Sequence, residues 1–132
     1  MVKSLKIPII IALIFTIAYA ALSIVRHSHY GSFGYDLGIE DQITWKFSQF
    51  ELPISTISDT PFVLSFKDHV EFIYMLLAPF YWIWDSVYFL LILQSFFFCF
   101  SAIPMFLLAE KYKLKPIIMY AVLIGYLMFY GV

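Results

Sequence analysis

Long apolar runs alternate with a single long polar stretch along this chain. The first run has about nineteen residues and, at about 1.5 Å per residue, can cross a hydrocarbon core of roughly 30 Å. The second run has about twenty-four uncharged residues, and the third begins at Pro116. This pattern predicts three transmembrane helices, over about residues 7–25, 86–109 and 116–132.

The polar stretch, residues 26–85, holds all three histidines and most of the acids, so any chemistry of the chain is expected there. A helix is predicted from Asp36 onward. Apolar residues recur there at spacings of four, four and three and share one helical face: Ile39, Ile43, Phe47 and Phe50. Such a helix is typical of a segment that lies along a membrane surface. Prolines and a Ser/Thr cluster then predict a loop over residues 51–67.

A shorter apolar segment, Val70 to Trp84, closes the polar stretch. Its uncharged core has about thirteen residues and contains Pro79, which makes it short for a span and typical of an interfacial segment. Its aromatic residues favour the headgroup level of a bilayer: Tyr81, Trp82 and Trp84. We therefore expect two membrane-lying amphipathic helices between the first two spans.

Two lysine clusters indicate the orientation. Lys3 and Lys6 precede the first run, and the densest cationic cluster, residues 110–115, follows the second. The positive-inside rule places both clusters in the cytoplasm, which requires an even number of crossings between them. The sequence thus predicts an all-α, multi-pass protein of the cell membrane, with a cytoplasmic N-terminus and one external loop over residues 26–85.

A secretory signal peptide is the alternative to the first span. Two lysines, an apolar core and Ala18-Tyr19-Ala20 resemble such a signal, with cleavage after Ala20. The apolar run continues to Val25, however, and it is long for a signal core. These features favour an uncleaved span.

Composition agrees with a membrane protein whose partner is the lipid bilayer. Of the 132 residues, 63% are hydrophobic and 13% are charged, with a mean hydropathy of +0.89. A soluble domain of this size needs more charge to cover its surface. The net charge of -1 gives no argument for nucleic-acid binding, and we expect none.

The histidines allow two interpretations. Asp68 and His69, with Glu71 nearby, could form an acid/base pair. Alternatively, His27, His29 and His69 with an acid could hold a divalent ion, because imidazole and carboxylate suit such metals. No metal-ligand spacing is present, so we predict no metal site and no cofactor.

Several short motifs follow one another in a recognisable order: RH at 26–27, FGYDLGIEDQITW at 33–45, KDH at 67–69, LLAPFYWIW at 76–84, LLILQ at 90–94 and AIPMFLLA at 102–109. In this order, the chain resembles the N-terminal part of the prokaryotic predicted membrane proteins grouped as domain of unknown function 2079. That family in turn is similar to the C-type glycosyltransferases, which take a sugar from a polyprenyl-phosphate lipid.

The resemblance implies a site in the external loop. C-type glycosyltransferases place an essential acid early in their first external loop, and Asp36 matches that position. Its plainer interpretation is a helix N-cap. The remaining candidates are catalytic Asp68 and His69 and substrate-binding Arg26, His27, Gln42 and Trp45. Arg26 could also be an ordinary residue at the flank of a span.

Two classes of function remain open. Residues 1–132 are expected to form the N-terminal part of a multi-pass membrane domain, with further membrane helices supplied by a partner chain. They would then belong to a glycosyltransferase that uses a polyprenyl-phosphate sugar. The alternative is a non-catalytic small membrane subunit or a truncated gene product. A transporter is a weaker option, because it would need buried charge in its spans, and the second span offers only Gln94.

Overall fold

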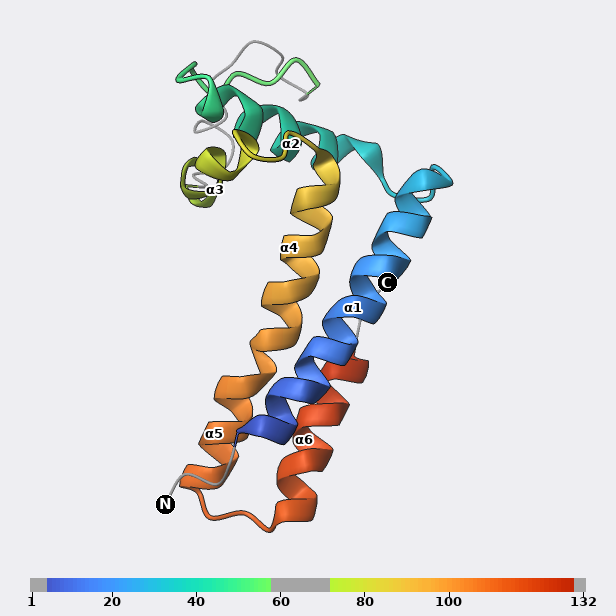
Figure 1. Cartoon of the computed structure of the whole chain (residues 1–132), viewed down its shortest axis with the longest axis vertical. Helices are drawn as coiled ribbons and strands as arrows, with labels where there is room; N and C mark the ends of the chain where they lie inside the picture. The colour runs from blue at the N-terminus through green and yellow to red at the C-terminus, as the bar shows by residue number, and fades with distance from the viewer. Residues whose placement is uncertain (1–4, 58–71, 130–132) are drawn as a thin grey trace. The chain divides into compact units, whose positions relative to one another are not determined.

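The computed structural model describes residues 5–57 and 72–129, and its regular elements there are six α-helices (Figure 1). In chain order they are α1 (Lys6–Ser28), α2 (Gly34–Ser48), α3 (Ile73–Tyr81), α4 (Val87–Phe100), α5 (Ala102–Lys111) and α6 (Pro116–Met128). The expectation of an all-α fold is confirmed for the described residues. The chain forms two compact units: the span unit, residues 1–25 and 91–132, and the loop unit, residues 26–90.

Among residues 5–57 and 72–129, two stretches of helix are long and apolar enough to cross a membrane, judged by length and composition. They are α1, with 23 residues, and the stretch Val87–Lys111 formed by α4 and α5, with 25 residues. Both correspond to predicted spans, and α1 continues without a break through Ala20. The third predicted span is represented by α6, which has only 13 residues and is short for a crossing.

The second stretch is interrupted at Ser101, between α4 and α5, which the apolar pattern did not predict. The cause lies three residues later, at Pro104. Proline has no N–H to bond to the backbone oxygen of Phe100, and its ring crowds that oxygen. The Ser101 N–H still bonds to the backbone oxygen of Phe97 at 3.0 Å, so the helix resumes at once.

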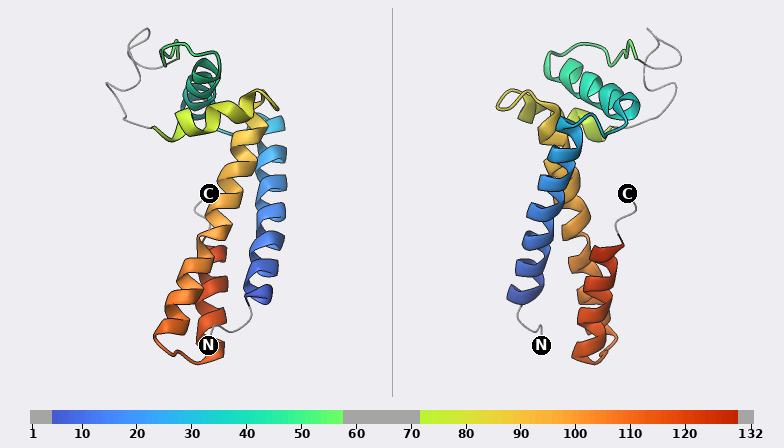
Figure 2. Two further views of the ribbon diagram at one scale, coloured as in Figure 1. Left: turned by 60° about the vertical axis from the view of Figure 1, so that its left-hand side comes forward. Right: turned by 90° about the vertical axis from the view of Figure 1, so that its right-hand side faces the viewer.

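The core of the span unit lies where α4, α5 and α6 meet. Its buried residues are Cys99, Ala102, Phe106, Ala109, Met119, Leu123 and Leu127. Leu5, just before α1, and three residues of α1 pack against it: Ile11, Phe15 and Tyr19. The Tyr19 hydroxyl also donates a hydrogen bond to the backbone oxygen of Leu127. In lipid, helices associate through close packing and such bonds rather than through the hydrophobic effect, and α5 and α6 run side by side accordingly (Figure 2).

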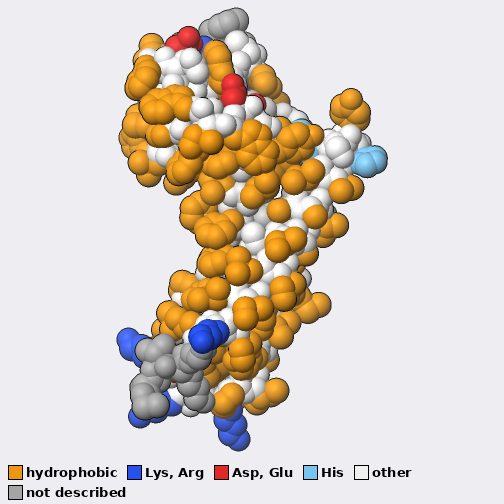
Figure 3. Space-filling view, viewed as in Figure 1, with side chains coloured by type: hydrophobic (Ala, Val, Ile, Leu, Met, Phe, Trp, Pro, Cys, Tyr) orange, Lys and Arg blue, Asp and Glu red, His pale blue; other side chains and the backbone are white. Residues whose placement is uncertain are grey.

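The outer surface of α1 is apolar along its whole length. Seven of its side chains are between 43% and 70% exposed: Ile7, Ile10, Leu13, Ile14, Ile17, Leu22 and Val25. Hydrophobic side chains cover the face of α1 that is visible in Figure 3. A continuous surface of this kind is unfavourable in water, by about 25 cal/mol per Å², whereas lipid chains accommodate it.

In the loop unit, α2 packs against α3 (Figures 1 and 2). Helix α2 begins at Gly34, two residues before the expected start at Asp36, and its N-cap is Phe33. It ends at Ser48, so Phe50 lies beyond the helix and not on the predicted apolar face. Helix α3 covers the middle of the predicted interfacial segment Val70 to Trp84, of which Val70 and Glu71 lie outside the described residues.

Three helices end in the same way, although none has the glycine that such an end prefers. In α1, α2 and α5 an N–H beyond the helix bonds to an oxygen five residues earlier: Gly31 to Arg26 at 2.8 Å, Glu51 to Lys46 at 2.9 Å and Leu114 to Ala109 at 3.1 Å. This Schellman motif requires a left-handed residue just before the donor. The residues there have φ values of 58°, 59° and 55°: Tyr30, Phe50 and Lys113. Each costs roughly 1 kcal/mol relative to glycine, because its Cβ crowds the backbone.

Replacing Tyr30 with glycine is expected to raise the free energy of unfolding by about 1 kcal/mol, because the left-handed strain is removed. Little packing is lost, since the Tyr30 side chain is 96% exposed. Thermal unfolding in detergent, followed by circular dichroism, measures the change. Tyr30→Ala is the control: it removes the ring but keeps the Cβ. An equal gain from alanine would show that strain is not the cause.

Candidate functional site

A buried polar stripe runs along the side of α2 that faces α3. Asp41, Thr44 and Ser48 are spaced by three and four residues and so share a helical face. Thr44 and Ser48 are buried, and Asp41 is half-buried. Both hydroxyls are satisfied, because Thr44 Oγ1 donates to the backbone oxygen of Glu40 at 2.7 Å and Ser48 Oγ to that of Trp45 at 2.6 Å.

Helix α3 and its cap complete this polar seam with two aromatic donors. The Tyr81 hydroxyl donates to Asp41 Oδ1 at 2.6 Å, and Trp82 Nε1 donates to the backbone oxygen of Ser48 at 2.7 Å. We use the name polar seam for Asp41, Thr44, Ser48, Tyr81 and Trp82. Tyr81 is only 4% exposed, whereas Trp82 and Trp84 are 61% and 47% exposed. The expected place of these residues at the headgroup level stays a prediction.

The environment of Tyr81 keeps its hydroxyl protonated. Burial raises the pKa of Tyr81 well above its usual range, and the hydrogen bond to Asp41 and the charges of Asp41 and Asp85 raise it further. The neutral hydroxyl is therefore a permanent donor to Asp41 at any physiological pH. Because the folded pKa is raised, this contribution to stability is complete below the ordinary tyrosine pKa of about 10 and declines only above it.

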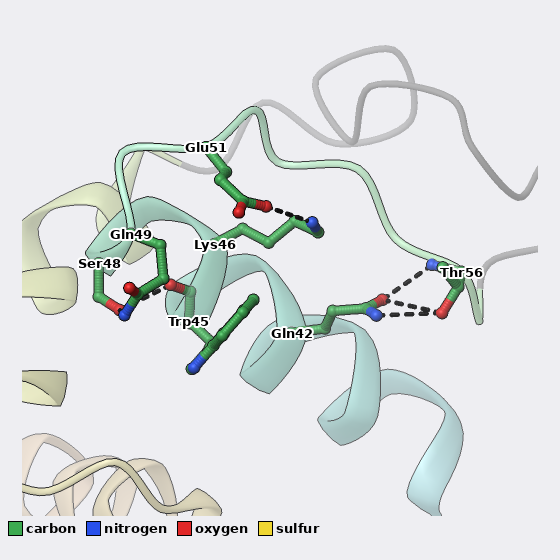
Figure 4. A network of polar contacts seen from close by, with 7 residues as sticks. All are labelled: Gln42, Trp45, Lys46, Ser48, Gln49, Glu51 and Thr56. Carbon is green, nitrogen blue, oxygen red and sulfur yellow. Dashed lines mark hydrogen bonds and ion pairs between the residues drawn. The ribbon is translucent and has the colours of Figure 1, made fainter.

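On another side of α2, polar side chains hold the segment that follows the helix (Figure 4). Gln42 Nε2 donates to Thr56 Oγ1 at 3.0 Å, and Gln42 Oε1 accepts the Thr56 N–H at 2.8 Å. Lys46 Nζ lies 2.6 Å from Glu51 Oε2, an exposed ion pair that contributes at most about 1 kcal/mol. Gln42, a predicted substrate-binding residue, thus uses its side-chain amide to hold the segment around Thr56 against α2.

Asp36 is the third residue of α2, and its side chain is exposed. No hydrogen bond or ion pair reaches its carboxylate from residues 5–57 or 72–129. The N-cap of the helix is Phe33, so Asp36 is not the N-cap, although its charge suits the positive end of the helix dipole. Trp45 lies further along α2, is 37% exposed and has Lys46 Nζ at 5.9 Å from its ring centroid.

Arg26 and His27 occupy the last turn of α1. Arg26 Nε donates to the backbone oxygen of Gly31 at 2.7 Å, and no other hydrogen bond reaches its exposed guanidinium from the described residues. A Cβ at Gly31 would lie 3.0 Å from Arg26 Cγ, so glycine is needed for this close approach. His27 Nδ1 shares a hydrogen bond of 2.8 Å with Ser32 Oγ, and its ring meets that of Tyr88 edge-on at 5.4 Å.

The predicted site residues that the structure describes all belong to the loop unit, but they do not form a cluster. Arg26, His27, Gln42 and Trp45 make no hydrogen bond or ion pair to Asp36. Asp68 and His69 lie outside the described residues. Within the described ranges, no three His, Cys, Asp or Glu side chains come together as metal ligands. The apolar pattern of the sequence did not predict the Asp41–Tyr81 pair. The spacing of Asp41, Thr44 and Ser48 is the signal that was present, because it marks a polar face on α2.

Comparison with known proteins gives one match. The model of a family described as "Predicted membrane protein (DUF2079)" matches residues 26–131, which is most of the chain. No curated protein and no solved structure matches.

Replacing Tyr81 with phenylalanine is expected to lower the free energy of unfolding by about 1–3 kcal/mol, because the partly buried Asp41 carboxylate loses its donor. Tyr88→Phe is the matched control: it removes the same atom from another tyrosine of the loop unit and keeps the ring contact with His27. Chemical unfolding in detergent compares the two variants. An equal loss in both would show that the Asp41–Tyr81 bond does not hold α2 on α3.

Proposed function

This chain belongs to the DUF2079 family of predicted membrane proteins, and we propose that it forms the N-terminal part of a membrane glycosyltransferase. The sugar donor in this proposal is a polyprenyl-phosphate lipid. One observation carries the assignment: Asp36 presents an exposed carboxylate, without a partner among the described residues, at the first turn of a helix between two candidate spans. This is the position at which the similar C-type glycosyltransferases place their essential acid.

The distribution of charge supports an external loop unit. The span unit has five lysines and one glutamate, a net charge of +4, whereas the loop unit has three basic residues and eight acids, a net charge of -5. The positive-inside rule assigns the lysines that flank α1 and α5 to the cytoplasm. In this proposal the protein lies in the cell membrane with a cytoplasmic N-terminus, and residues 26–85 form its external loop.

The exposed large apolar residues of the loop unit support contact with the bilayer surface. Phe50, Trp82 and Ile83 are 86%, 61% and 86% exposed, and the rings of Phe50 and Trp82 touch with centroids 5.8 Å apart. Large apolar side chains with satisfied polar groups are favoured at the headgroup level. At that depth a polyprenyl-phosphate donor presents its phosphate while its tail remains in the hydrocarbon.

Asp36 then serves as the general base. Its carboxylate takes the proton of the acceptor hydroxyl, the acceptor oxygen bonds to the anomeric carbon, and the bond between that carbon and the phosphate oxygen breaks. The polyprenyl phosphate leaves with the bonding electrons. Arg26 offers an exposed guanidinium that can stabilise this charge, since phosphate suits its paired donors.

The other candidates have supporting roles in this proposal. His27 and the exposed Trp45 contact the donor, whereas Gln42 positions the loop through Thr56. Asp68 and His69 supply a second acid/base pair from the same loop. One observation favours the alternative, a non-catalytic membrane subunit: Gln42 and Arg26, two of the predicted substrate-binding residues, make hydrogen bonds within the chain.

Asp36→Asn in a complete member of the family is expected to lower sugar transfer by about a hundredfold or more, as for loss of a general base. The amide has nearly the same size, so expression and thermal stability should be unchanged. The readout is release of polyprenyl phosphate from a polyprenyl-phosphate sugar. Asp85→Asn is the control, because Asp85 is also an exposed acid of the loop unit. Full transfer by the Asp36 variant, or a loss proportional to the loss of folded protein, would contradict the assignment.

A further inference from the structure

The span unit carries its charge at one place. Its described residues contain only five charged side chains, four lysines and one glutamate: Lys6, Glu110, Lys111, Lys113 and Lys115. Four of these lie within residues 110–115, which end α5 and connect it to α6, and basic side chains gather at this end of the helix pair in Figure 3. We call Lys111, Lys113 and Lys115 the lysine end.

The lysine end is available to an outside partner. All three residues are exposed, and no hydrogen bond, ion pair or ring contact reaches their side chains from the described part of the chain. Glu110 is the one acid among residues 110–115, and it has an interaction of its own. Three ammonium groups within five residues, beside one carboxylate, leave a local net positive charge of +2 that favours binding of an anion.

Lys113 has a backbone conformation that glycine adopts more easily than any other residue. Its φ of 55° is left-handed, and the Leu114 N–H bonds to the oxygen of Ala109 just beyond it. A strained residue that keeps a long cationic side chain is a reason to look for a function of that side chain. The left-handed residue also turns the chain sharply, which brings Lys111 and Lys115 to the same short connection.

The lysines alternate with apolar side chains. Tyr112 is 71% exposed, Leu114 39% and Ile117 75%. A surface that interleaves ammonium groups with apolar side chains, at the end of a helix long enough to cross a bilayer, fits the boundary between headgroups and acyl chains.

We propose that the lysine end binds anionic phospholipids of the bilayer through their headgroup phosphates. The ammonium groups pair with the phosphate oxygens, and Tyr112, Leu114 and Ile117 lie against the acyl chains. The proposal does not depend on the glycosyltransferase assignment, because it concerns the span unit and a lipid that is not a substrate. It makes the lysine end a selective lipid contact as well as an orientation signal.

The full chain, reconstituted in phosphatidylcholine vesicles with a trace of spin-labelled phosphatidylglycerol or spin-labelled phosphatidylcholine, tests this proposal. The wild-type chain should retain the anionic label preferentially. Lys113→Gln should lower the preference by up to about fivefold, and neutralising all three lysines should abolish it. Near 1 M salt, where the Debye length is about 3 Å, the wild-type preference should also disappear.

Two further variants separate charge from fold. Lys113→Gly removes the charge and relieves the left-handed strain, so it should lose as much preference as Lys113→Gln while gaining thermal stability. Replacing all three lysines with arginine keeps the charge and should keep the preference. The proposal is overturned if the triple glutamine variant retains the wild-type preference, if that preference survives high salt, or if the arginine variant loses it.

Discussion

Hydrocarbon cannot solvate a charge or a bare peptide group, and an unsatisfied backbone group there costs several kcal/mol. The two candidate spans follow from this constraint. Between Ile7 and Val25, and between Ser86 and Ala109, the chain has no charged residue. Both stretches are helical, so their backbone groups bond within the segment. Even at the interruption, the Ser101 N–H donates a hydrogen bond to the backbone oxygen of Phe97 at 3.0 Å.

The same constraint explains why polar groups of the loop unit turn inward. In the proposed placement of α2 along a membrane surface, one side of the helix has apolar surroundings, so its polar groups are stabilised best by partners within the fold. Asp41 and Ser48 find such partners in Tyr81 and Trp82, at 2.6 and 2.7 Å. This seam fixes α2 on α3. Asp36 lies on the same helix, and its carboxylate is exposed; the role proposed for it in sugar transfer would need this access.

Apolar run length predicted α1, the stretch from α4 to α5, and the short α3 correctly, because each is decided by local hydrophobicity. The pattern did not predict features that depend on single residues or on distant partners. Pro104 interrupts the second span, and Phe50 in a left-handed conformation ends α2 before its expected apolar face is complete. Tyr81 pairs with Asp41, 40 positions away; the spacing of Asp41, Thr44 and Ser48 marks a polar face on α2 but does not identify the partner of that face. The roles of Asp36 and Arg26 in sugar transfer stay predictions.

The central claim is that residues 26–85 form one external loop between two crossings. Labelling with a membrane-impermeant maleimide in intact cells tests it most directly, in a Cys99→Ala background that removes the single native thiol. A cysteine replacing the exposed Glu51 should label in intact cells, whereas one replacing the exposed Tyr112 should label only after permeabilisation. Labelling of both positions from the same side of the membrane would contradict the account.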